Sequence, residues 1–352
     1  MYNRQITFAR EYRGLTQTKL ASMVQGLSQS NLSKYEKGLN TLSEETIIRA
    51  IKAMNFPVEF LNLNIGNVSE NRHYRKKASI TVGNRSFIDR HISLIGYCVD
   101  WMMDSIDIPP FKFTYIDIEG GISPEEVARH IRRQFRLGVD PIVDLVNFLE
   151  QNGVIVYFWD CEHSEFDGVS LITDGGNHLV VVNKNRSNDR IRMTLAHELG
   201  HIIMHQCVGF FITESRDKER EAMKFAAEFL MPEQGIQGSL NNVKFKDLAV
   251  LKQYWLVSMN ALVVRAYNLN QIDKTKYVTL MTELSRRGWR TTEPYPIDLD
   301  EPLIISKAIG LLKDELDYDN HQISEATKLP IDIVNEIFQL HVKMRILTLN
   351  IK

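Results

Sequence analysis

A histidine-rich segment, residues 189–205, constrains this chain most. It reads DRIRMTLAHELGHIIMH, in which His197 and His201 are four residues apart. On an α-helix such residues lie about 40° from each other, so both imidazoles can bind one metal ion. Glu198 lies on the flank of the pair, where its carboxylate is better placed to hold a water molecule than to bind the metal. The pattern His-Glu-x-x-His therefore predicts a two-ligand zinc site with a general base beside it.

The residues around the motif favour an amphipathic helix. Its apolar side chains recur on one side and comprise Leu195, Leu199, Ile202 and Ile203. Gly200 weakens a helix interior by about 1 kcal/mol unless close packing requires it. We therefore expect close packing at Gly200, and the alternative is a structural helix that carries its histidines by chance.

A catalytic zinc ion needs a third protein ligand and an open fourth position. The next helix, expected from about residue 216 to 230, offers Glu219, Glu221 and Glu228. Helical angles place Glu219 on a small, apolar stripe, whereas Glu221 and Glu228 point to the opposite, charged side. The carboxylate on the apolar stripe would face the histidines, so we predict Glu219 as the third ligand.

Two further residues lie near the motif. His205 completes a row of histidines at every fourth position, and we expect it to be structural or to support a ligand rather than to bind the metal. Cys207 can coordinate metal in principle, but a small buried thiol is the expected state. The other cysteines, Cys98 and Cys161, are distant, so neither a disulfide framework nor a Cys-x-x-Cys pair is predicted.

The first sixty residues show a helix-turn-helix pattern. Helices are expected to end near Gly14, to run from Thr16 to about Val24 and from Ser28 to about Glu36, and to lie between Ser43 and Met54. Lys and Arg outnumber Asp and Glu by eight to five over residues 1–60, although the whole chain carries a net charge of −2. This end is therefore a mildly basic module in a nearly neutral protein.

The same residues resemble the Xre/Cro-type repressor family. The family's Leu-Thr-Gln start stands here at residues 15–17, its alanine is Ala21, and its third helix spans Ser28 to Ser33 with Glu36 and Gly38 behind it. The turn between Ala21 and Ser28 is one residue longer than the commonest form.

The resemblance implies an all-α, lambda-repressor-like DNA-binding domain over residues 1–62, whose third helix enters the major groove of double-stranded operator DNA. The side chains expected at base edges or phosphates are Gln17, Gln29, Ser30, Asn31 and Lys34. The alternative is a small helical interaction domain with a polar face.

Residues 63–92 are expected to form a basic linker and the start of a helix. The basic side chains are Arg72, Arg75, Lys76, Lys77, Arg85 and Arg90. Beside a DNA-binding module such a stretch can add phosphate contacts, although it is as often only solvated.

Residues 93–240 combine helices with a small sheet. Ser123 to Glu126 form a helix start with a capping box and a proline at the first position. GVIVYFW at residues 153–159 predicts a strand, and GVSLIT and HLVVVN predict a hairpin with a glycine-rich turn. Because HLVVVN directly precedes the histidine helix, we hypothesise that it pairs with an extended substrate.

A second resemblance covers roughly residues 70–300. LAHELGHIIMH followed by EREAMKFAAEFLMP is similar to the ImmA/IrrE family of metallo-endopeptidases. It implies an α+β, zincin-like fold with one Zn²⁺ per chain, held by His197, His201 and Glu219, and with Glu198 as the catalytic base. Members commonly have Asn where Met223 stands, which affects the tuning of the site more than its ligation.

The C-terminal region, residues 241–352, is expected to be helical. Helices are predicted within residues 245–269 and from about 303 to 316, whereas residues 270–300 look irregular or extended. HQISEATKLPIDIVNEIF predicts a second small helix-turn-helix, whose acidity favours packing or a dimer contact over DNA.

These features predict a mainly α protein with a small β-sheet: a helix-turn-helix domain, a metallopeptidase domain and a helical C-terminal region. The expected function is a cytoplasmic transcriptional regulator fused to a zinc endopeptidase that cleaves a helix-turn-helix repressor, an antitoxin or itself. The alternative is a non-proteolytic regulator whose metal domain is structural or sensory. A homodimer is possible, and neither a signal peptide nor a membrane span is expected.

Overall fold

The computed structural model describes residues 2–65, 81–104, 106–207, 213 and 215–339. Two compact units divide the chain. The first comprises residues 1–69, 79–107 and 305–352, and the second comprises residues 70–78 and 108–304. Four basic residues of the expected linker, Arg72, Arg75, Lys76 and Lys77, lie outside the described residues.

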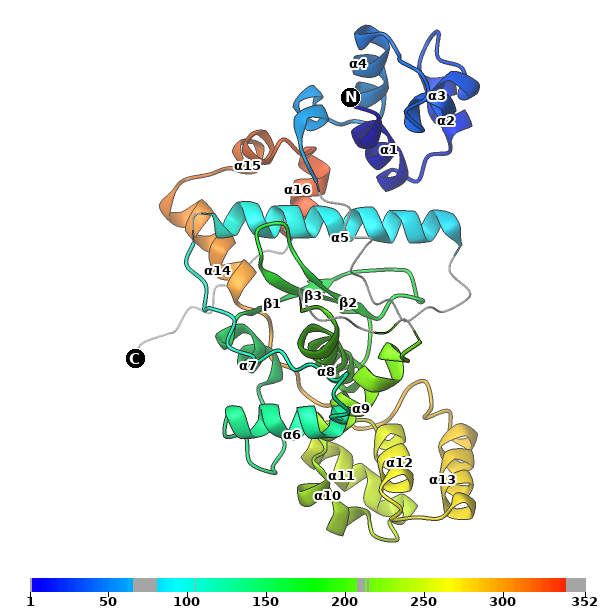
Figure 1. Cartoon of the computed structure of the whole chain (residues 1–352), viewed down its shortest axis with the longest axis vertical. Helices are drawn as coiled ribbons and strands as arrows, with labels where there is room; N and C mark the ends of the chain where they lie inside the picture. Colours follow the sequence, from blue (N-terminus) through cyan, green and yellow to red (C-terminus); the bar gives the residue numbers. More distant parts are fainter. Residues whose placement is uncertain (1, 66–80, 105, 208–212, 214, 340–352) are drawn as a thin grey trace, which may run out of the picture. The chain divides into compact units, whose positions relative to one another are not determined.

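The first unit begins with the predicted helix-turn-helix. Its helices are α1 (Asn3–Tyr12), α2 (Gln17–Met23), α3 (Gln29–Glu36) and α4 (Glu44–Ala53), followed by the 3-10 turn η1 (Val58–Asn62) (Figure 1). The side chains of Thr16, Ser28 and Ser43 cap α2, α3 and α4 by accepting a backbone N–H three residues on. Leu20, Leu32 and Ile51 are fully buried between the helices. The predicted helix positions are confirmed.

The same unit also contains α5 (Val82–Met103), α15 (Asn320–Thr327) and α16 (Ile331–Ile337). Arg90 of α5 pairs with Glu11 of α1 at 2.9 Å. Arg13 at the end of α1 pairs with Asp332 of α16 at 2.5 Å. The acidic C-terminal helix pair therefore packs within its own unit. This agrees with the prediction that its acidity favours packing or a dimer contact over DNA binding.

The second unit contains a three-stranded sheet in the order β1-β3-β2, formed by β1 (Val154–Trp159), β2 (Gly168–Ile172) and β3 (His178–Asn183). The predicted hairpin is confirmed, because β2 pairs antiparallel with β3. In addition β1 pairs parallel with β3, from Val154 opposite His178 to Trp159 opposite Asn183. Because HLVVVN is thus the central strand, both its edges are occupied, and the hypothesis that it pairs with a substrate is wrong.

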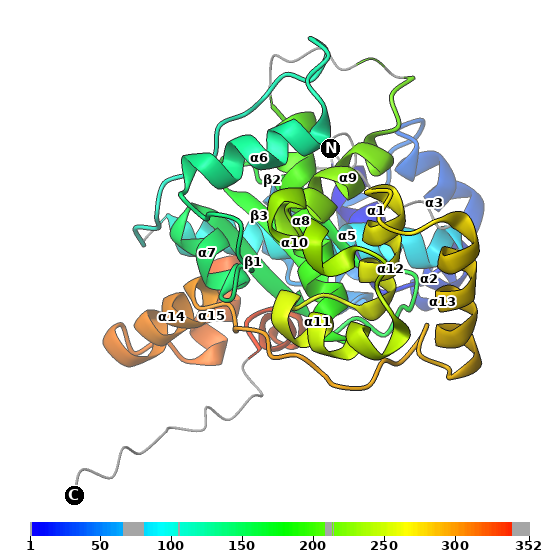
Figure 2. The same cartoon turned by 90° about the horizontal axis from the view of Figure 1, so that it is seen from below.

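The second unit also contains helices. They are α6 (Pro124–Gln134), α7 (Leu145–Gln151), α8 (Asn188–His205), α9 (Lys218–Leu230), α10 (Glu233–Leu240), α11 (Leu248–Trp255), α12 (Met259–Asn268) and α13 (Lys274–Arg286), with the 3-10 turn η3 (Phe245–Asp247) before α11. The capping box at Ser123 is present. Helix α8 contacts β2 and β3 along one face of the sheet, and α9 packs against α8 (Figure 2).

Helix α13 corrects the expectation that residues 270–300 are irregular. Asp273 caps its first turn by accepting the N–H of Lys276 at 2.7 Å. Leu280 and Leu284 are buried, which anchors one face of the helix. Gly288 ends the segment with a positive φ of 73°, so the prolines that suggested irregular structure lie beyond the helix.

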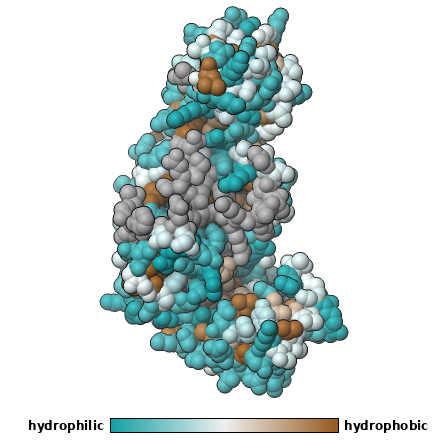
Figure 3. Space-filling model, turned by 45° about the vertical axis from the view of Figure 1, so that its right-hand side comes forward, coloured by the Kyte–Doolittle hydropathy of each residue, from teal (hydrophilic) through white to brown (hydrophobic). Residues whose placement is uncertain are grey.

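Beyond α13 the chain reaches α14 (Ile304–Gly310) and the π-helical turn η4 (Leu311–Glu315). The carboxylate of Glu150 accepts the N–H groups of Leu303 and Ile304 at 2.7 and 3.2 Å. The mainly helical architecture with a small sheet is confirmed. The visible face in Figure 3 is mostly hydrophilic with small groups of hydrophobic residues, and no described helix is long and apolar enough to cross a membrane.

Candidate metal centre and DNA-contacting helix

The side chains of His197, His201 and Glu219 converge in the second unit. Their ligand atoms all lie within 4.8 Å of one another. The Nε2 atoms of His197 and His201 are 3.1 Å apart, and each lies 3.4 Å from an oxygen of Glu219. The predicted residues are therefore together in space, and metal binding by them stays a prediction.

The spacing of these atoms fits a zinc ion. Ligands at about 2.0–2.1 Å from a tetrahedral ion lie about 3.3 Å from one another, which matches the three separations. Burial opposes ionisation of Glu219, but hydrogen bonding to His197 and His201 outweighs it and lowers the pKa of Glu219 below its usual value. A carboxylate facing two imidazole nitrogens is a typical zinc donor set.

Gly200 brings the two ligand-bearing helices together. A Cβ atom at this position would lie 3.0 Å from Cδ1 of Phe225 on α9. The expected close packing at Gly200 is confirmed, and it lets Glu219 of α9 reach the histidines of α8.

His205 forms a hydrogen-bonded row behind His201. Its Nδ1 lies 2.9 Å from Nδ1 of His201, and its Nε2 lies 3.0 Å from Oε2 of Glu221. Arg216 donates to the other oxygen of Glu221 at 2.9 Å. If Nε2 of His201 is unprotonated, Nδ1–H of His201 donates to His205, and Nε2–H of His205 donates to Glu221. One set of tautomers satisfies every contact in the row.

Glu198 lies buried beside the ligands, with 3% of its surface exposed. Ser170 of β2 donates its hydroxyl proton to Oε2 of Glu198 at 2.7 Å, and Gln206 donates to the same hydroxyl at 2.8 Å. Burial raises the pKa of Glu198 to about 7, against the opposing effects of His197 and Ser170. No sequence motif includes Ser170 or Gln206, although Ser170 is the polar residue within an otherwise apolar strand.

The other carboxylates of α9 differ from their predicted positions. Glu228 was expected on the charged outer side, but only 1% of it is exposed. It pairs with Arg265 and, at 3.3 Å, with Arg129. Glu221 is half-buried because it contacts His205. Helical angles alone could not show that arginines from other helices neutralise a buried glutamate.

The predicted DNA-contacting side chains lie around α3. Those at its first turns and outer face are exposed: Gln29, Ser30, Asn31 and Lys34. Gln17 at the start of α2 accepts from Nε2 of Gln29 at 3.0 Å and donates to Glu36 at 2.7 Å. This network holds Gln29 in place, and DNA contact by the five residues stays a prediction.

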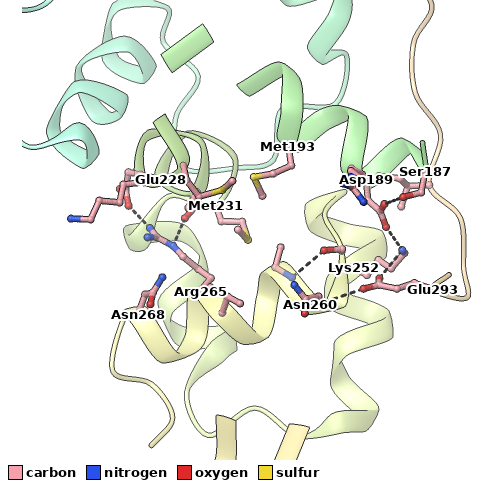
Figure 4. A pocket seen from close by; sticks show the side chains of 18 of the residues that line it. Ser187, Asp189, Met193, Glu228, Met231, Lys252, Asn260, Arg265, Asn268 and Glu293 are labelled. Atoms are coloured by element: carbon pink, nitrogen blue, oxygen red, sulfur yellow. Dashed lines mark hydrogen bonds and ion pairs between the residues drawn. The ribbon is translucent and has the colours of Figure 1, made fainter. Parts of the chain in front are cut away.

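A large cleft in the second unit borders one of the three proposed ligands. Its volume is about 1750 Å³, and Glu219 is among the residues that line it. The walls include residues of α8, α9 and α12 and of the segments 185–187 and 290–297, and Figure 4 shows Met193 between Glu228 and Asp189. The volume exceeds the roughly 300–1,000 Å³ of a small-molecule pocket.

Comparison with known families agrees with both domains. Residues 149–267 match the model of a peptidase family described as the IrrE N-terminal-like domain. Residues 8–61 match a model described as helix-turn-helix. A search of curated proteins found no match to the chain. The chain therefore carries a helix-turn-helix domain followed by an IrrE/ImmA-like peptidase domain.

Proposed function

We propose that the chain is a DNA-binding transcriptional regulator whose peptidase domain is a zinc-dependent endopeptidase. It would cleave a repressor or antitoxin-type protein, or its own chain, and so relieve repression. The observation that carries the proposal is the convergence of His197, His201 and Glu219 with Glu198 buried beside them. A purely structural zinc site has no need of a carboxylate next to its ligands.

His197, His201 and Glu219 would hold the ion. When bound, zinc lowers the pKa of a water molecule to about 7 and polarises a carbonyl group. Glu198 would take a proton from the attacking water on its carboxylate and later deliver that proton to the leaving amine.

An extended substrate would add to β2, which corrects the earlier hypothesis about the central strand. β2 occupies one edge of the sheet, and its Ser170 contacts Glu198. Backbone hydrogen bonds to that edge would hold a peptide next to the catalytic carboxylate.

The test compares wild type with Glu198→Gln on candidate repressors co-expressed with the protein. We expect both proteins to contain zinc and only the wild type to cleave. Cleavage by the variant would refute the role of Glu198. If neither protein cleaves any candidate while both bind promoter DNA, the chain is a non-proteolytic regulator whose metal domain is structural or sensory.

A further inference from the structure

The side chain of Ser170 connects strand β2 to the proposed catalytic base on α8. Its hydroxyl donates to Oε2 of Glu198 at 2.7 Å, and Gln206, at the end of α8, donates to the same hydroxyl at 2.8 Å. The exposed fractions of Ser170, Glu198 and Gln206 are 1%, 3% and 9%. Because the three side chains are buried, water competes little for these hydrogen bonds.

The orientation of the Gln206 amide is fixed by a group that can only accept. Its Nε2 lies 3.1 Å from the backbone oxygen of Ser170, and a carbonyl oxygen has no proton to donate. The nitrogen end of the amide must therefore face β2, since the reversed amide would set two oxygens against each other. The two protons of this nitrogen then serve the two oxygens of Ser170. The hydroxyl of Ser170 accepts from Gln206, so its own proton is directed to Glu198.

Strand β2 and helix α8 are in direct contact around this hydrogen bond. Gly168 lies two residues before Ser170 and on the same face of β2. A Cβ atom at Gly168 would lie 2.5 Å from Cγ2 of Thr194, which precedes Glu198 by one helical turn. A hydrogen bond between two packed elements holds a side chain more firmly than a bond from a loop. The anchor of Glu198 is therefore rigid.

The backbone oxygen of Ser170 lies at the free edge of β2. Thr173 donates its backbone N–H to Asn177 of the hairpin at 2.9 Å. Because hydrogen-bonded and non-hydrogen-bonded pairs alternate in an antiparallel ladder, Ser170, three residues earlier, points its backbone groups away from β3. Gln206 occupies this oxygen, so a peptide on the edge would pair with the strand residues on either side of Ser170.

We propose that Ser170 is a positioning residue for the catalytic base and that Gln206 sets the direction of its hydroxyl. With Oε2 of Glu198 held in this way, Oε1 is the oxygen that takes the proton from the attacking water. The inference rests on the proposed function and adds two residues to the machinery of that site. Both act through Glu198.

The test compares Ser170→Thr with Ser170→Val, because threonine and valine have nearly the same shape and differ in the hydroxyl group. The probe is acetohydroxamic acid, whose hydroxamate ligates zinc and whose proton can pass to a carboxylate beside the ion. Calorimetry with the zinc-loaded full-length protein requires no knowledge of the natural substrate. We expect the threonine variant to bind the probe about 10-fold more tightly than the valine variant. Zinc affinity, measured by chelator competition, should be the same in both.

The same pair of substitutions in a Glu198→Ala background is the control. Without the carboxylate the threonine and valine variants should bind acetohydroxamic acid alike, because the hydroxyl has no base to hold. A difference that persists in this background would mean that Ser170 acts by another route, and the inference would be overturned.

Gln206→Leu tests the second residue of the proposal. It should weaken binding of the probe by less than Ser170→Val does, since the hydroxyl of Ser170 remains but its direction is no longer fixed. The double variant should bind no more weakly than Ser170→Val alone, because Gln206 acts through that hydroxyl. Additive losses, or no loss in Gln206→Leu, would overturn the role of Gln206.

Failure of the proposed function and failure of this inference give different results. If wild type binds neither zinc nor acetohydroxamic acid, the proposed function fails and the inference fails with it. If wild type binds both and the threonine and valine variants bind the probe equally, the metal site stands and the positioning role of Ser170 alone is overturned.

Discussion

The orientation of His201 depends on His205, which touches the far side of its ring. Hydrogen bonds link Arg216 to Glu221, Glu221 to His205, and His205 to His201. One assignment of donors and acceptors satisfies all of these contacts. That assignment leaves Nε2 of His201 unprotonated, which is the state that a metal ion needs. His205 is therefore a positioning residue for a ligand.

Replacing His205 should weaken zinc binding without removing a ligand. We expect His205→Leu to raise the zinc dissociation constant about 10- to 100-fold, because the ring of His201 loses its partner. His205→Gln should restore part of the affinity, since an amide can accept from His201 and donate to Glu221. Competition with a chromogenic chelator measures both constants. Equal zinc affinity in wild type and the leucine variant would contradict the positioning role.

His91 makes the stability of the first unit depend on pH. It is fully buried and stacks on Tyr12 with ring centroids 5.7 Å apart. Burial lowers the pKa of His91 from 6.5 to about 3. The unfolded chain therefore binds a proton below about pH 6.5 that the folded chain does not bind, so stability falls as the pH decreases through this range.

The expected loss from this residue is about 2 kcal/mol between pH 7.5 and pH 5. His91→Phe should flatten the dependence of the unfolding free energy on pH, measured with denaturant at both pH values. His321→Gln, at an exposed histidine of α15, is the matched control and should leave the dependence unchanged. An equally steep dependence in His91→Phe would show that other groups cause it.

At the scale of elements, the close packing of α8 against α9 brings the proposed metal ligands together. His197 and His201 come from α8, whereas Glu219 comes from α9. The contact of Gly200 with the ring of Phe225 sets how closely the helices approach. A Cβ atom at Gly200 would press on the ring of Phe225, so that ring or α9 itself must give way.

Gly200→Ala is expected to destabilise the protein by about 1–3 kcal/mol through overpacking and to weaken zinc binding. Gly238→Ala in α10 is the matched control, because a Cβ atom there meets nothing within 4 Å. It should be neutral or stabilise by up to about 1 kcal/mol, since alanine is the better helix former. Thermal unfolding and zinc titration measure both effects. A stable Gly200→Ala variant with normal zinc affinity would contradict this role.

Local signals in the sequence predict which residues form each helix and strand. They predict poorly which of these elements pack against each other. The capping box at Ser123 and the glycine-rich turn of the hairpin depend on residues close in the chain, and both were found. The parallel pairing of β1 with β3 joins segments about twenty residues apart and leaves no local pattern. The contact of Ser170 with Glu198 depends on that tertiary arrangement, so the metal ligands could be proposed and the partner of the base could not.

At the scale of the whole chain, two compact units carry the two candidate sites. Gln29 and its neighbours belong to the first unit, and the metal centre belongs to the second. The residues proposed for each site all lie within one unit. Substitutions in one site should therefore leave the local chemistry of the other unchanged.

Gln29→Ala should impair DNA binding and leave the proposed peptide cleavage intact. Gln29 is exposed at the first position of α3 and is held by Gln17 at 3.0 Å, so its loss should weaken binding of the preferred promoter sequence by about 1–3 kcal/mol. Lys34→Ala should instead weaken binding to all sequences alike and reduce the salt dependence, because a lysine contacts phosphate. Fluorescence anisotropy with specific and scrambled DNA at several salt concentrations distinguishes the two. Both variants should retain zinc and cleavage, and a loss of cleavage in either would show that the DNA-binding helix acts on the peptidase domain.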